Sequence, residues 1–252
     1  MGCMLDSVIE LLNFVRNHFH FLVIYIHKTL TLISTMKLIY FDARGLIEQT
    51  RIMLKITGIP FEDVRLPMKL REGGGFITDE FAAQKAAGDF YVNMDRVPIL
   101  IVDGVTIGQS KAIDRFVAKR CNMLGQTDLE AAQIDCITEH IRDIKDKYIK
   151  VKSAPNADKE DGLKRWFATD LPEQFAKLEK SLPTTRTAGF CIGSAISYAD
   201  VFLWCFACDY FDDKASAIAA LANCESLKAI VSMVGDKAPL KTWLAERPTN
   251  FI

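Results

Sequence analysis

Tyr40 occupies a position in the chain where we expect chemistry. It lies near the end of residues 37–41, which predict a short strand, and a polar turn then leads into a helix that begins near Leu46. A side chain at the carboxyl end of a strand, beside the N-terminus of the next helix, projects into the crevice where open α/β sheets bind ligands. The helix adds free N–H groups and a positive dipole end. We therefore place the first candidate site at Tyr40.

A proline at the start of a later strand is a second candidate feature. Val97 and Pro98 open residues 97–102, at a point where a missing N–H does little harm. A cis bond between them would turn the backbone of Val97 outward and leave it free to pair with an extended peptide. An ordinary proline at a sheet edge explains the pattern equally well, so both interpretations stay open.

Gln109 and Ser110 stand where the following helix begins. An amide, a hydroxyl and the N–H groups of the helix start together suit a carboxylate. Capping of the helix by Ser110 accounts for the serine equally well. The pair is therefore a candidate anion site that its own pattern leaves undecided.

Two patterns in the second half of the chain favour a structural role. Ser197 and Asp200 form a capping box, in which each side chain bonds the other residue's backbone N–H at a helix start. Cys205 and Cys208 have the spacing of a redox or zinc pair, but they lie inside an apolar helix without a second pair. We interpret both cysteines as residues of the core.

The composition is that of a soluble globular protein, with 50% hydrophobic and 25% charged residues. A formal net charge of −1 gives neither the basic surface of a nucleic-acid-binding protein nor an acidic tail. The seven cysteines follow no framework spacing, which predicts reduced thiols in an intracellular protein. We expect no nucleic-acid partner.

Residues 1–35 differ from the rest of the chain. His18, His20 and His27 lie here, but no further ligands accompany them in the pattern, so we expect no metal. The uncharged run around them is shorter than the ~20 apolar residues that a spanning helix needs. An upstream start before Met36 and an amphipathic, weakly anchoring helix both remain open for this segment.

The spacing of apolar and turn residues divides the remaining chain into two parts. The first predicts the order β-α-β-(α)-β-β-α, with a long irregular stretch over residues 68–97 that includes one short helix. The second predicts helices only. The predicted strands are 37–41, 61–66, 97–102 and 105–107, and the predicted helices are 46–57, 76–87, 110–119, 129–150, 163–182, 197–211, 215–222 and 225–237.

These pieces, in this order, resemble a cytosolic glutathione S-transferase of the tyrosine type (sigma-, pi- and alpha-like). The motifs are YFDARG after the first strand, VPILIVDG, QSKAI at a helix start, and ISYAD in the helical part. The similarity covers residues 36–243. Four motifs in this order and spacing are specific to the family.

The resemblance implies an α+β fold with an N-terminal extension (residues 1–35), a thioredoxin-like domain with a mixed four-stranded sheet (36–121) and an all-helical domain (128–252). It implies a cytoplasmic, homodimeric enzyme of detoxification and xenobiotic metabolism, which conjugates the thiolate of its co-substrate glutathione to hydrophobic small-molecule electrophiles. Membrane association is expected only if the extension is real. The alternatives are a non-catalytic binding or scaffold protein of the same fold, and a glutathione-dependent isomerase or peroxidase.

The resemblance also implies roles for the candidate residues. The hydroxyl of Tyr40 would donate a hydrogen bond to the sulfur of bound glutathione and stabilise the thiolate. The backbone of Val97, before cis-Pro98, would pair with the cysteinyl part. Gln109 and Ser110 would hold the γ-glutamyl carboxylate.

Further roles follow from the same resemblance. Arg44 would support the turn after the first strand and contribute to the local positive field. Asp143 would reach across a dimer interface toward the γ-glutamyl amine. Lys69, Arg71 and Arg96 are the candidates for holding the glycyl carboxylate.

The chain departs from the family pattern at two places. Leu46 stands where many tyrosine-type members have a second basic residue, and Asp95 and Arg96 precede Val97 where a glutamine is usual. The electrophile is expected between Tyr40 and the first helix of the second domain, with the two residues Tyr148 and Lys147 as walls.

Overall fold

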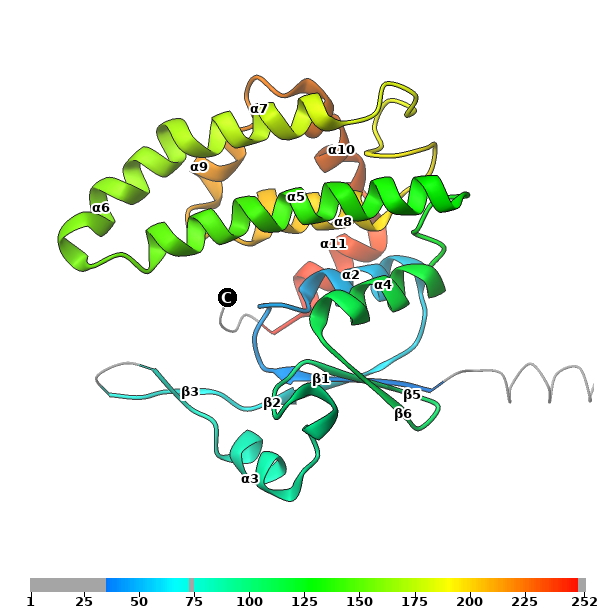
Figure 1. Ribbon diagram of the computed structural model, residues 1–252, viewed down its shortest axis with the longest axis vertical. Coiled ribbons are helices and arrows are strands. Elements are labelled where there is room, and N and C mark those ends of the chain that lie inside the picture. Colours follow the sequence, from blue (N-terminus) through cyan, green and yellow to red (C-terminus); the bar gives the residue numbers. More distant parts are fainter. Residues whose placement is uncertain (1–34, 73–74, 249–252) are drawn as a thin grey trace, which may run out of the picture.

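The computed structural model describes residues 35–72 and 75–248 (Figure 1). The two interpretations of the N-terminal extension therefore concern residues that, apart from Thr35, lie outside the described part of the chain. Within the described residues, no helix is long and apolar enough to cross a membrane.

A mixed four-stranded sheet, in the order β2-β1-β5-β6, forms the first half of the structure. Strand β1 (Met36–Phe41) pairs in parallel with β2 (Glu62–Leu66) and antiparallel with β5 (Ile99–Val102). Strand β5 pairs antiparallel with β6 (Val105–Gly108). Four of the six residues of β1 are buried, because the strand is central and both faces of the sheet are covered. The predicted mixed four-stranded sheet is confirmed.

Helices cover both faces of this sheet. Helices α2 (Glu48–Thr57) and α4 (Ser110–Arg120) lie between the sheet and the helical domain, and α3 (Asp79–Ala87) lies against the opposite face (Figure 1). Gly58 ends α2 with a left-handed backbone, at φ 68°. The two layers of helix leave the carboxyl end of β1 facing the second domain.

Three predicted boundaries in this half are wrong by two residues or more. Strand β5 begins at Ile99 rather than at Val97. Helix α2 begins at Glu48 rather than near Leu46, because Leu46 belongs to the turn that follows β1. Residues 76–77 do not belong to α3, since β4 (Phe76–Ile77) pairs with β3 (Lys69–Leu70) as a small hairpin. Strands of two residues have no periodicity that a sequence pattern could show.

The second half is all helical, as the resemblance implied. Residues 156–181 form two helices joined through a π-helical turn without a break, and they begin earlier than predicted. A second π-helical turn follows the helix at residues 198–204 and ends at Asp209, before the next helix begins. The helices are α5 (Asp128–Lys152), α6 (Asn156–Arg165), α7 (Leu171–Ser181), α8 (Tyr198–Trp204), α9 (Lys214–Ala219), α10 (Glu225–Gly235) and α11 (Ala238–Glu246), and the π-helical turns are Trp166–Asp170 and Cys205–Asp209.

The two structural interpretations in this half are confirmed. The capping box at the start of α8 is present, with the N–H of Ser197 donating to the carboxylate of Asp200 over 2.6 Å. Cys205 and Cys208 are free thiols, Cys205 is buried, and both pack in or against the core.

A buried carboxylate joins the two halves of the molecule. Asp114 of α4 accepts hydrogen bonds from Gln49 and Thr50 of α2. It also accepts them from Arg142 of α5 (2.9 Å) and from the hydroxyl of Tyr198 of α8 (2.8 Å). A carboxylate that has lost its hydration needs such donors. Because they come from three helices, they fix how the helical domain sits on the sheet domain.

Candidate active site

The hydroxyl of Tyr40 lies at the carboxyl end of β1, in contact with the turn that leads to α2. The backbone N–H of Leu46 donates to this hydroxyl over 3.4 Å, and Gly45 packs against it. Burial raises the pKa of Tyr40, while the bond from Leu46 and the charge of Arg51 lower it by less. The hydroxyl is therefore protonated at neutral pH and its own hydrogen is available to an acceptor.

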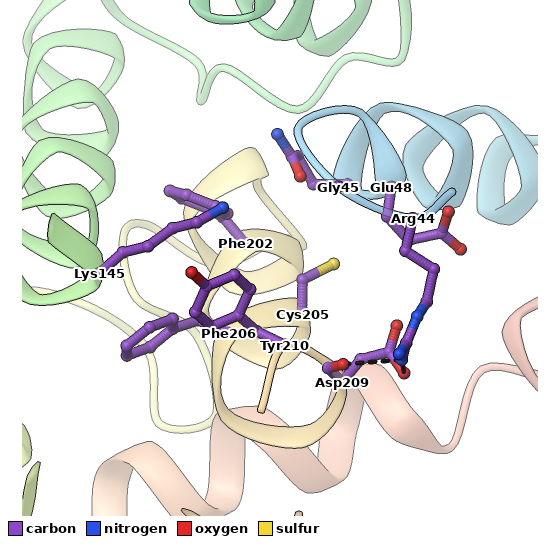
Figure 2. Close-up of a pocket in the computed structure, with 10 residues that line it drawn as sticks. Arg44, Gly45, Glu48, Lys145, Phe202, Cys205, Phe206, Asp209 and Tyr210 are labelled. Atoms are coloured by element: carbon purple, nitrogen blue, oxygen red, sulfur yellow. Dashed lines mark hydrogen bonds and ion pairs between the residues drawn. The ribbon is translucent and has the colours of Figure 1, made fainter. Parts of the chain in front are cut away.

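The turn between β1 and α2 is held from the helical domain. Arg44 donates to the backbone oxygen of Asp209 over 2.8 Å and to its carboxylate over 2.9 Å (Figure 2). Burial acts to raise the pKa of Asp209, but hydrogen bonds and charges from Arg247, Lys214 and Arg44 lower it to about 2. Arg44 thus ties the turn to the helical domain through an ion pair that crosses the domain interface.

Asn93 binds together the two loops in which candidate ligand-binding residues lie. Its side-chain amide donates to the backbone oxygens of Pro98 (2.9 Å) and Arg96 (3.1 Å), and its oxygen accepts from the N–H of Gln109 (3.0 Å). Gly108 passes so close that an added Cβ would lie 2.7 Å from Cβ of Asn93. Asn93 itself is 4% exposed, so these bonds are shielded from water.

The backbone before α4 differs from the expected helix cap. Gln109, not Ser110, takes the N-cap position, and no side chain caps the helix. Gln109 has φ +67°, a region that non-glycine residues rarely occupy. The bond from its N–H to Asn93 holds it there, so Ser110 becomes the first residue of α4 and the capping explanation for this serine is wrong. The Val97–Pro98 peptide bond is cis.

The remaining candidates lie at the surface. Arg96 is exposed beside the same loop, where its Nε donates to the oxygen of Asn93 over 3.4 Å. Lys69 is exposed in the β3–β4 hairpin. Asp143 is exposed on α5, in a groove between α5 and α7 that Lys147 and Lys177 also line. The structure does not bring Lys69 or Asp143 into contact with Tyr40.

A cavity of about 30 Å³ lies where the two domains meet, and Figure 2 shows the side chains around it. Gly45, which packs against the Tyr40 hydroxyl, also lines this cavity. The opposite walls come from α5, α8 and the π-helical turn, and they are largely aromatic. The lining residues are Arg44, Gly45, Glu48, Gln49, Lys145, Phe202, Cys205, Phe206, Asp209 and Tyr210.

The predicted walls Tyr148 and Lys147 do not line this cavity. Tyr148 is 3% exposed and packs against Trp166 and Phe211 inside the helical domain. Lys147 is exposed and donates to Gln174. The helical rotation of 100° per residue explains the difference, because Lys145 is the α5 residue that faces the cavity.

Sequence reasoning missed Asn93, Asp209 and Lys145. Asp209 acts through Arg44, which is 165 residues away in the chain, and Asn93 through Gln109, which is 16 residues away. Lys145 belongs to a charged run that reads as a solvated helix face. The sequence held one signal for Asn93. Gly108 lies at a strand end, and a glycine there indicates that another part of the chain packs closely against the backbone.

Both halves of the chain match family descriptions. Residues 36–119 match "Glutathione S-transferase, N-terminal domain" and residues 142–247 match "Glutathione S-transferase, C-terminal domain". A glutathione S-transferase of Dirofilaria immitis is 31% identical over 214 residues, which cover 84% of this chain and 92% of that protein.

Solved structures agree with these matches. The Pi-class glutathione S-transferase of Onchocerca volvulus has a TM-score of 0.69 at 29% identity, covering 84% of this chain and 93% of that one. A monomeric glutathione S-transferase of the hookworm Necator americanus has a TM-score of 0.71 at 26% identity, covering 86% and 100%. The chain belongs to the glutathione S-transferase family and is a transferase with a thioredoxin-like first domain and a helical second domain.

Proposed function

We propose that this transferase binds glutathione beside Tyr40 and conjugates its thiolate to hydrophobic electrophiles, as a cytoplasmic homodimer that serves detoxification. The observation that supports Tyr40 most directly is the hydrogen bond from Leu46 to its hydroxyl. That bond occupies a lone pair of the oxygen and turns the hydroxyl hydrogen away from the turn. A buried, protonated hydroxyl is the donor that a sulfur anion needs.

The hydroxyl would act by favouring the charged form of the thiol. A free thiol has a pKa of about 8.5, so only a few per cent is thiolate at neutral pH. A hydrogen bond to the sulfur anion lowers this pKa, and the thiolate is the nucleophile. The sulfur then bonds to an electrophilic carbon, either displacing a leaving group or adding to an activated double bond.

The rest of glutathione would lie along the two loops that Asn93 binds together. The backbone of Val97 pairs with the cysteinyl part in this proposal, and Gln109 with Ser110 holds the γ-glutamyl carboxylate. Ser110 is the first residue of α4, and the free N–H groups and positive dipole end of a helix start favour an anion. Arg96 is the preferred holder of the glycyl carboxylate, because it is exposed at this loop, whereas Lys69 lies in a separate hairpin.

The proposal also gives roles to Asp143, at the dimer interface, and to Arg44, in the turn between β1 and α2. Asp143 lies exposed on α5, and in this proposal it reaches toward a glutathione bound to a partner subunit. Arg44 keeps its turn in place through Asp209 rather than by touching the ligand.

The test is an ultraviolet titration of the glutathione thiolate bound to the purified full-length chain and to the Tyr40→Phe variant. We expect an apparent thiol pKa well below 8.5 for the natural chain, a return toward the free value in Tyr40→Phe, and similar glutathione affinity in both by calorimetry. Binding without a lowered thiol pKa in the natural chain would refute the role of Tyr40. Absence of saturable glutathione binding would favour a non-catalytic scaffold instead.

A further inference from the structure

Lys145 brings a positive charge to the cavity between the domains. It projects from α5 toward α8 and its amine end lies near Phe202 (Figure 2). Its Nζ is 4.3 Å from the ring centroid of Tyr210, which is a cation–π contact. Among the described residues, no hydrogen bond or ion pair joins this amine to an acidic side chain.

The two carboxylates that also line the cavity are engaged by other cations. Asp209 pairs with Arg44, Lys214 and Arg247. Glu48 accepts from Arg247 over 2.7 Å and from the indole of Trp243 over 2.9 Å. They are therefore satisfied without Lys145, and the cavity keeps one cation in excess on its α5 side.

A charged amine that is partly removed from water loses favourable hydration free energy. Burial lowers the pKa of Lys145, while the charge of Asp114 raises it and that of Arg142 lowers it. An ammonium that has lost part of its hydration gains most from an anion placed directly against it. The rings of Phe202 and Tyr210 beside the amine offer apolar contact and a cation–π contact.

The size of the cavity limits what such an anion can be. A volume of about 30 Å³ holds a small polar group rather than a whole electrophile, since a single water needs roughly 10–15 Å³ of such space. Gly45, the residue that touches the Tyr40 hydroxyl, lines one wall of the cavity. A molecule could thus place a small anionic end in the cavity and its reactive carbon toward Tyr40.

We propose that Lys145 selects electrophiles that carry a carboxylate at the end remote from the reacting carbon. This inference rests on the proposed conjugation at Tyr40 and names its substrate class. In the addition of glutathione to an α,β-unsaturated ketone, sulfur bonds to the β-carbon and the π electrons move to the carbonyl oxygen. A proton from water is then taken up at the α-carbon. The remote carboxylate is unchanged, so Lys145 acts on binding and orientation, not on bond making.

The experiment uses two probes that share the reactive enone and differ at the remote end, where one is charged and the other neutral: benzylideneacetone with a para-carboxylate, and the methyl ester of that acid. The full-length protein is compared with Lys145→Met and with the matched control Lys147→Met. Lys147 lies two residues further along the same helix, is exposed, and bonds Gln174. Both substitutions remove one positive charge from α5, but only the first removes it from the cavity.

We expect Lys145→Met to lower kcat/KM for the acid about tenfold, the usual order for a partly desolvated ion pair, and to leave the ester within about twofold. Lys147→Met should leave both values unchanged. If the ratio of kcat/KM for the acid to kcat/KM for the ester is the same in the natural chain and in Lys145→Met, the inference is overturned.

A binding measurement separates this inference from the proposed function. Calorimetry uses the analogues of the two probes in which the reactive double bond is saturated, so that binding is measured without any conjugation. Tighter binding of the acid, lost in Lys145→Met and kept in Lys147→Met, supports the inference even if neither unsaturated probe is conjugated, in which case the proposed function fails. Equal affinity of the natural chain for the saturated acid and its ester overturns the inference about Lys145.

Discussion

Gly45 is the residue through which the position of the Tyr40 hydroxyl can be tested. It has φ +50°, and a Cβ placed on it would lie 2.6 Å from the hydroxyl oxygen and 2.8 Å from the ring. Gly45→Ala therefore adds two penalties. A left-handed backbone costs a non-glycine residue about 1–2 kcal/mol, and the new methyl group must push the Tyr40 ring or the turn aside.

Gly58 provides the matched control. It ends α2 at φ +68°, and nothing lies within 4 Å of a Cβ added there. Gly58→Ala thus introduces the backbone penalty without the contact to Tyr40. The difference between the two variants isolates the effect on the hydroxyl.

The expected loss of turnover in Gly45→Ala follows from the hydrogen bond between the Tyr40 hydroxyl and the glutathione sulfur, which would be lost. A hydrogen bond to a charged group is worth about 1.5–3 kcal/mol, and each 1.4 kcal/mol corresponds to about tenfold in rate. We expect Gly58→Ala to lower the free energy of unfolding in urea by about 1–2 kcal/mol, and Gly45→Ala to lower it further because of the added contact with Tyr40. Only Gly45→Ala should lose turnover with chlorodinitrobenzene, by about 10- to 100-fold. Equal kcat values for the two variants, with glutathione still bound, would refute the reasoning.

Two further perturbations test the residues that hold the site in place. Asp209→Asn should destabilise the protein by roughly 2–3 kcal/mol at pH 7, since the pKa of Asp209 falls from its ordinary 3.8 to about 2 on folding. This stability is present above about pH 4 and is lost as the pH falls toward 2, so urea unfolding curves of the two proteins should converge in acid; a constant difference would contradict the assignment. Asn93→Ala should raise KM for glutathione about tenfold while kcat and the pKa of the bound thiol change little, because it releases Gln109 and Pro98 but not Tyr40. Steady-state kinetics with varied glutathione checks this, and a loss confined to kcat would show that Asn93 acts elsewhere.

The capping box and the first strand were predictable because their signals are local. Ser197 and Asp200 are three residues apart and bond each other whatever surrounds them. Strand β1 follows from a short apolar run ended by a polar turn. The mixed sheet and the helical second domain followed from the order of such segments together with the family resemblance.

The face that a helix turns to a cavity was not predictable in the same way. Residues 145, 147 and 148 of α5 are all polar or aromatic, and their order in the chain does not reveal which one points toward α8. The structure turns Lys145 to the cavity, Tyr148 into the core and Lys147 outward. Packing of α5 against its neighbouring helices settles this rotation.

The sequence by itself determined the four strands of the main sheet, most of the helices, and the place of Tyr40 near the end of a strand, because these depend on neighbours a few positions away. Only the tertiary structure decided that Asp209 secures Arg44 and that Asn93 holds Gln109 in a left-handed backbone. It also decided that Lys145 faces an aromatic cavity. These arrangements depend on contacts between residues far apart in the chain, and no local pattern specifies such partners.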